Sequence, residues 1–258
     1  MRQSSVLPAV LLFTLFSCSV KEKRCDCPCY LYVDFSVEDP GIVASSEIDV
    51  SSEDGFLFDA VLDSSVCSRG VSVPVPRGEV SVNVVAYDGG MFVPGNGLVI
   101  PWGGDCPPLY FHHSDVDTSS DSARDTVRLH KSYCAVTVRL LSRESSESLV
   151  FEICGNVCGY DRQGSPLGGD FASAGEVLED GRSLVRIPRQ LDSSLRLRVV
   201  GSGEVVREFA LGEYMSSGGY DWTAPDLEDV DVTVDFALAA VTVKVENWSV
   251  KYVYDVEI

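Results

Sequence analysis

The sequence has little histidine and none of the short motifs that mark common catalytic or nucleotide-binding sites. Its 258 residues include 3 His and 3 Met. No H-E-x-x-H pair is formed: we expect the adjacent His112 and His113 to be loop residues rather than ligands, and His130 stands alone at the expected domain junction. G-x-S-x-G, a P-loop and G-x-G-x-x-G are also missing. We therefore expect no cofactor, no metal and no enzymatic activity.

Basic residues are scarce as well. The chain has 20 Lys and Arg against 39 Asp and Glu, which gives a net charge of −19. Such a surface repels nucleic acid, so nucleic acid is not an expected partner. An acidic stretch that opens with Asp115 and Asp117 resembles the start of a calcium loop. Ser120 and Thr126 stand where that loop needs glycine and glutamate, which favours a solvated loop.

Helical periodicity is nearly absent, and only Leu211–Ser217 has the pattern of a short helix. Alternating apolar residues instead predict many short strands, for example over Val80–Tyr87 and Cys134–Leu141, separated by Gly and Pro turns. This pattern predicts an all-β fold of two β-sandwich domains. We place the N-terminal sandwich at residues 30–130 and the C-terminal sandwich at residues 131–258.

The N-terminus lacks an apolar run long enough to span a membrane. Val6–Phe16 is apolar apart from Pro8 and Thr14, and it follows Arg2, as in a secretory signal peptide. Cys18 stands where a bacterial lipobox has its acylated cysteine, and an incidental cysteine after an ordinary signal peptide is the alternative. We predict a signal peptide over residues 1–17 and lipid attachment, such as palmitate, at Cys18. Stable anchoring needs more than one acyl chain, which a lipoprotein amino terminus supplies.

Cysteine is abundant, with 9 residues in the chain. The C-x-C-x-C spacing at the start of the mature chain lacks the paired C-x-x-C units of zinc sites, so a metal cluster is disfavoured. In an exported protein, an even set of further cysteines indicates a disulfide framework whose pairing the sequence does not fix. The lipidated, Cys-rich tether covers residues 18–29, and the candidate disulfide cysteines are Cys25, Cys27, Cys29, Cys67, Cys106, Cys134, Cys154 and Cys158.

Three groups of residues together resemble one family. These are Cys18–Ser36, then Asp125–Lys131 leading into Cys134–Val138, then Leu211–Tyr214 with Tyr220–Trp222 and Asp226–Phe236. The chain is similar along its mature length to the FimB-type anchor and accessory subunits of type V fimbriae, a lipoprotein family of Gram-negative anaerobes. The resemblance implies two transthyretin-like sandwiches, a surface-exposed lipid anchor in the outer membrane, and a role in fimbrial attachment and cell adhesion.

The partners implied are fimbrial shaft or accessory subunits, joined by addition of a strand to an open sheet edge. The last segment has the alternation and the aromatic and β-branched content of such a donor strand, at Val250, Tyr252, Tyr254, Val256 and Ile258. It could equally be the last strand of its own domain. Shaft subunits of such fimbriae are trimmed at the N-terminus by a protease, and no Arg-based processing site is evident here in a linker like theirs. This favours an anchor that keeps its N-terminal segment over a trimmed shaft subunit.

The main alternative is a surface glycan-binding lipoprotein. That function needs an aromatic platform beside hydrogen-bonding side chains, and Trp102, Tyr110 and Tyr160 are the candidates. The sequence leaves open which fimbrial subunit is contacted and whether the chain is a base anchor or an accessory subunit.

Overall fold

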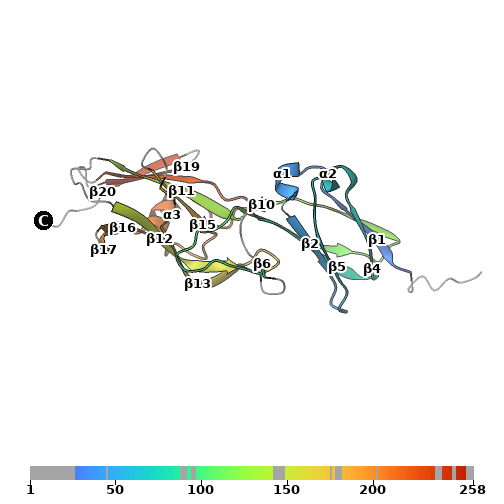
Figure 1. Ribbon diagram of the computed structural model, residues 1–258. Helices are drawn as coiled ribbons and strands as arrows, with labels where there is room; N and C mark the ends of the chain where they lie inside the picture. Colours follow the sequence, from blue (N-terminus) through green and yellow to red (C-terminus); the bar gives the residue numbers. More distant parts are fainter. Residues whose placement is uncertain are drawn as a thin grey trace, which may run out of the picture.

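The structure is a computed structural model in which short strands predominate. It describes residues 27–44, 46–87, 92–93, 97–141, 149–174, 176–177, 182–201, 203–235, 240–245 and 248–253. The strands form two groups arranged end to end, with β1 near one end of the molecule and β20 near the other (Figure 1). No helix among the described residues has both the length and the apolar character that a membrane span requires.

The first group contains two sheets. In the three-stranded sheet, β1 lies between an antiparallel and a parallel neighbour, in the order β4 (Val71–Val75), β1 (Cys29–Asp34), β9 (Ser122–Thr126). The second sheet is antiparallel throughout, in the order β10 (His130–Lys131), β8 (Leu109–Asp117), β5 (Glu79–Tyr87), β2 (Ser46–Ser51), β3 (Leu57–Val61).

Two four-residue helices, α1 (Pro40–Val43) and α2 (Val66–Arg69), connect strands of the first group. α1 begins where Pro40 occupies the first turn and the Asp39 carboxylate accepts a hydrogen bond from the Gly41 amide at 2.7 Å. Proline and an aspartate cap are the residues that favour a helix start, because both suit the unpaired amides of the first turn.

The second group also contains two sheets. One has six strands in the order β14 (Glu176–Val177), β15 (Ser183–Pro188), β11 (Tyr133–Leu141), β18 (Val230–Asp235), β19 (Ala240–Val245), β20 (Trp248–Val253). The other runs β17 (Glu204–Phe209), β16 (Arg196–Gly201), β12 (Leu149–Tyr160), β7 (Gly97–Val99), β6 (Phe92–Val93), with β13 (Pro166–Ser173) also paired to β12. The helix α3 (Leu211–Ser217) follows β17.

Each group encloses its own hydrophobic core between its two sheets. In the first, Leu31 and Val33 of β1 pack with Val82 and Val84 of β5. In the second, both sheets contribute fully buried side chains, for example Val136 of β11 and Leu197 of β16. Buried and more exposed residues alternate along β16 and most of β1, as expected when one face of a sheet packs inward, whereas β5 is buried on both faces over Val82–Ala86. The all-β sandwich prediction is therefore confirmed, and the transthyretin-like detail stays a prediction.

A third, smaller cluster joins the two groups. It consists of Val85, Leu98, Leu109, Phe111 and Tyr160, all buried. β7 pairs with the end of β12, so residues 97–99 belong to a sheet of the second group although they precede β8 of the first. The domain bounds predicted at residues 130 and 131 stay a prediction.

The predicted loop around the histidines and acidic residues is wrong. His112, His113, Asp115 and Asp117 lie in β8, which pairs along its full length with β5. Both faces of this strand carry polar residues whose hydrogen bonds are satisfied, so apolar alternation is weak there. On the outer face His113 contacts Asn83 and Asp115 accepts from Ser81, whereas the buried His112 and the half-buried Ser114 contact Asp125.

Candidate functional site

One arginine binds the chain where the predicted tether leads into the first strand. Arg77 lies in the turn between β4 and β5, and its Nε donates to the carbonyl oxygen of Cys27 at 2.9 Å. Its Nη1 donates to the carbonyl of Ser119 at 2.6 Å, and its Nη2 pairs with the Asp121 carboxylate. We call Cys27, Arg77, Ser119 and Asp121 the tether base. Directly after it, the Tyr30 amide donates to the Asp121 carbonyl at 3.0 Å, and β1 begins.

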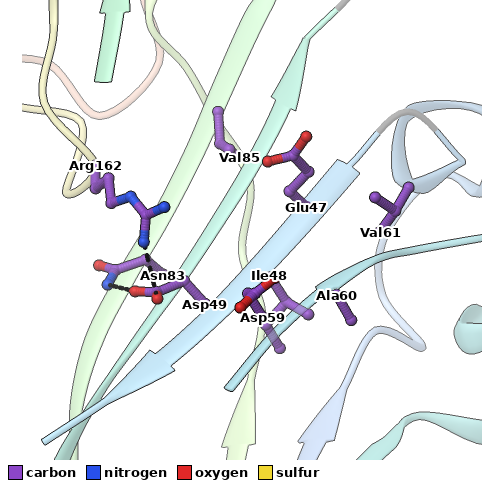
Figure 2. A pocket seen from close by; sticks show the side chains of 9 residues that line it. All are labelled: Glu47, Ile48, Asp49, Asp59, Ala60, Val61, Asn83, Val85 and Arg162. Carbon is purple, nitrogen blue, oxygen red and sulfur yellow. Dashed lines mark hydrogen bonds and ion pairs between the residues drawn. The ribbon is translucent and has the colours of Figure 1, made fainter. Parts of the chain in front are cut away.

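A second feature is a cavity of about 210 Å³ on the outer face of β2, β3 and β5. Its lining is shown in Figure 2 and comprises Glu47, Ile48, Asp49, Asp59, Ala60, Val61, Asn83, Val85 and Arg162. We call it the edge cavity, because β3 is the last strand of its sheet. Arg162 reaches it from the turn between β12 and β13, so both groups of strands contribute to the cavity.

The turn that carries Arg162 is built by its own sequence. The Asp161 carboxylate accepts hydrogen bonds from the amides of Gln163 and Ser165, at 3.0 and 2.8 Å. Gly164 has a φ of +81° and lies against Phe111, where a Cβ would come within 2.7 Å of the ring. Glycine is needed there both for the left-handed backbone and for the close contact. This contact sets the turn against β8 and directs Arg162 toward β2.

A row of hydrogen bonds crosses the sheet behind the cavity. Arg162 Nη1 lies 3.1 Å from Asp49 Oδ2, and Asn83 Nδ2 donates to Asp49 Oδ1 at 3.0 Å (Figure 2). Asn83 Oδ1 lies 2.7 Å from His113 Nδ1. Because an amide oxygen can only accept, His113 Nδ1 must carry the proton in this contact. This contact orients the His113 ring and makes it the last member of the row.

The cavity carries more negative than positive groups. Glu47, Asp49 and Asp59 are its carboxylates, and Arg162 is its one cation. Glu47 Oε1 also accepts a hydrogen bond from the Tyr87 hydroxyl at 2.7 Å. Burial and this bond raise the pKa of Tyr87 to about 12, so its hydroxyl stays protonated and keeps donating.

The chain segment that leaves the first group is held by two carboxylates of the second. Asp226 accepts from the Lys131 amide at 2.8 Å and lies 3.2 Å from His130 Nδ1. Asp229 accepts from Lys131 Nζ at 2.6 Å and from the Ala135 amide at 2.8 Å. These contacts fasten β10 and the start of β11, where the chain passes between the groups.

The predicted lipid-attachment residue Cys18 and the predicted disulfide residue Cys25 lie outside the described residues. The other seven candidates carry free thiols and form no disulfide with one another. Burial raises the pKa of Cys134 to about 12 and that of Cys154 to about 11, which keeps both thiols protonated at neutral pH. Disulfide formation stays a prediction. No cluster of three metal-ligating side chains occurs among the described residues.

The candidate donor strand begins within β20. This strand pairs antiparallel with β19, with Val250 opposite Val243 and Tyr252 opposite Val241. Tyr254, Val256 and Ile258 lie outside the described residues. The segment therefore packs, over its first part, in its own sheet, and its donation to a neighbour stays a prediction.

The aromatic candidates for a glycan platform are in different environments. Trp102 is 67% exposed, whereas Tyr160 is fully buried. The Tyr160 hydroxyl donates to the Ser132 carbonyl and accepts from the Arg189 amide at 2.6 Å. Tyr110 is half-buried and forms an edge contact with Tyr133, with ring centroids 5.9 Å apart. Tyr160 cannot face a ligand in this arrangement.

Sequence reasoning missed Arg77 and Arg162. Both lie in segments recognised only as turns, and a single arginine in a turn has no spacing that identifies its partner. The one available signal was the small number of basic residues. The chain has 20 basic residues against 39 acidic ones, so few cations are present to pair with its carboxylates.

Comparison with known proteins finds similarity in structure alone. No protein-family model matches the sequence, and no curated protein sequence matches it. Among solved structures, the fimbrial anchor protein Mfa2 from Porphyromonas gingivalis aligns with a TM-score of 0.59 and 15% identity, over 86% of this chain and 99% of that one. The chain has the fold of this anchor protein.

Two further structures share the fold. A proposed adhesin from Bacteroides ovatus aligns with a TM-score of 0.60 and 15% identity, over 88% of this chain and 95% of that one. A proposed polysaccharide-binding protein from Bacteroides thetaiotaomicron gives a TM-score of 0.61 at 16% identity, over 87% and 98%. The resemblance noted in the sequence is thus confirmed at the level of the fold.

Proposed function

We propose that this chain is a non-enzymatic anchor or accessory subunit of a fimbrium, held on the outer surface of the outer membrane by lipid on Cys18. The observation that carries the proposal is the match to the fimbrial anchor protein Mfa2 over nearly the whole of both chains. Because fold alone does not fix function, the acylation pattern at Cys18 and the tether base behind it are the further support.

The arrangement of β1 suits a protein that bears load. Beyond the tether base, a pull on the tether reaches the first sheet at Cys29, the first residue of β1. β1 is hydrogen-bonded on both sides, to β4 and to β9. Hydrogen bonds between strands run across the strand direction, so a pull along β1 loads many of them at once. The tether base adds three side-chain bonds from Arg77 before this ladder is reached.

At the other end of the molecule, β20 forms the edge of the six-stranded sheet (Figure 1). We place the contact with fimbrial subunits there, with the segment that starts in β20 as the donor in strand addition. Main-chain hydrogen bonds would supply the affinity and alternate side chains the specificity.

Acylation is tested by growing cells with labelled palmitate and recovering the protein from membrane and soluble fractions. We expect label and membrane retention in the unmodified chain, and loss of both in Cys18→Ala. Cys27→Ala, which changes an exposed thiol of the same tether, is the matched control and should keep both. Label that persists in Cys18→Ala, or label lost equally in both variants, contradicts the proposal.

A further inference from the structure

The strand β3 is an unprotected sheet edge. It pairs with β2, and no described strand covers its other side. Leu57 is 59% exposed and Val61 is 77% exposed. Soluble proteins commonly guard such edges with lysine, proline or a bulge, because unpaired main-chain groups recruit other strands. The sequence of β3, Leu-Phe-Asp-Ala-Val, contains neither lysine nor proline, and its pairing with β2 has no register shift.

The charge beside this edge is unbalanced. Asp59 lies directly opposite Asp49 in the β2–β3 register. Two like charges at such a position are destabilising. Asp49 is compensated by Arg162 and Asn83, whereas Asp59 has no hydrogen bond or ion pair with any described residue. Figure 2 shows Asp59 next to Asp49 at the cavity, with Ala60 and Val61 following along the strand.

We propose that β3 and the edge cavity bind an extended segment of a partner polypeptide that carries a lysine or arginine between two apolar residues. Leu57, Asp59 and Val61 share one face, because strand side chains alternate. A strand added to β3 would present its own alternate residues to that face. The sequence apolar-x-Lys-x-apolar therefore matches Leu57, Asp59 and Val61 one for one.

The cationic side chain would lie against Asp59, toward the cavity that Glu47 and Asp49 also line. A side-chain cation fits better than a metal ion, since Glu47, Asp49 and Asp59 line the cavity but no group of three such side chains among the described residues could hold a metal ion. The identity of the partner as a fimbrial subunit rests on the proposed function. The match between the acidic, apolar surface of β3 and a basic, apolar segment does not depend on that function.

The test measures binding of a labelled synthetic peptide, Thr-Val-Thr-Lys-Thr-Val-Thr, to the purified full chain by fluorescence anisotropy at low salt. A second peptide has glutamate in place of lysine. We expect the lysine peptide to bind the unmodified chain more tightly than the glutamate peptide. The variant Asp59→Lys should weaken binding of the lysine peptide about tenfold, because an attraction is replaced by a repulsion of similar size.

Glu53→Lys is the matched control, since it makes the same charge change in an exposed turn outside the cavity and should leave affinity unchanged. Asp59→Lys removes a repulsion with Asp49, so loss of binding through unfolding is not expected, and a melting curve checks this. Equal binding of both peptides, no binding of the lysine peptide, or equal losses in the two variants would overturn the proposal. The assay needs no membrane, so its outcome is separate from that of the Cys18→Ala experiment.

Discussion

Replacing Arg77 with alanine should loosen the tether base and lower the free energy of unfolding. The change removes one bond to the Cys27 carbonyl, one to the Ser119 carbonyl and one ion pair with Asp121. Arg77 is 17% exposed at its side chain, whereas Asp121 is 76% exposed, so the ion pair itself contributes little. Bonds from a charged donor contribute about 1.5–3 kcal/mol each when buried and less near the surface, so we expect a loss of about 2–3 kcal/mol.

The assay is urea denaturation of the purified chain with the unmodified protein in parallel. Arg69→Ala is the control, because Arg69 makes one ion pair, to Asp63 at 3.6 Å, with both side chains about two-thirds exposed. That variant should lose less than about 0.5 kcal/mol. In single-molecule pulling from the N-terminus, Arg77→Ala should also unfold at lower force than Arg69→Ala. Equal stability and equal unfolding force in the two variants would show that Arg77 does not hold the tether in place.

Three further predictions concern the junction and the acid response. Tyr160→Phe leaves the Ser132 carbonyl and an amide without their buried partner and should cost about 1–3 kcal/mol in urea denaturation; no loss would contradict this role. Arg162→Ala should cost about 1 kcal/mol in the same assay, and an unchanged midpoint would show that the pair with Asp49 adds nothing. The Arg124 hydrogen bond lowers the pKa of Asp34, so its stabilisation is present above about pH 4 and lost as pH falls through the lowered value. The difference in melting temperature between Arg124→Ala and the unmodified chain should therefore vanish near about pH 2, and a difference that persists there would contradict the assignment.

The sequence predicted well where strands bury one apolar face. β5 and β11 were expected from strict alternation, and α3 has the predicted bounds Leu211–Ser217. β8 was missed because His113 and Asp115 occupy its outer face, where cross-sheet hydrogen bonds replace apolar contacts. Alternation measures burial against a core and cannot detect a polar row that is satisfied by neighbouring strands.

The functional surfaces were harder to predict than the strands. The edge cavity combines side chains from β2, β3 and β5 with Arg162, which is far away in sequence. The register that sets Asp59 opposite Asp49 depends on how β2 pairs with β3, and β2 itself was not predicted. A site made by strand pairing becomes visible only when the register is known.

We propose that this chain supports a fimbrium on the outer membrane, as an anchor or accessory subunit, through lipid on Cys18. Electron microscopy of cells that carry Cys18→Ala, together with an assay for fimbriae released into the medium, tests it most directly. We expect shed or abnormally long fimbriae and loss of the protein from the membrane fraction. Fimbriae of normal length that stay attached to these cells would contradict it and favour the surface glycan-binding alternative.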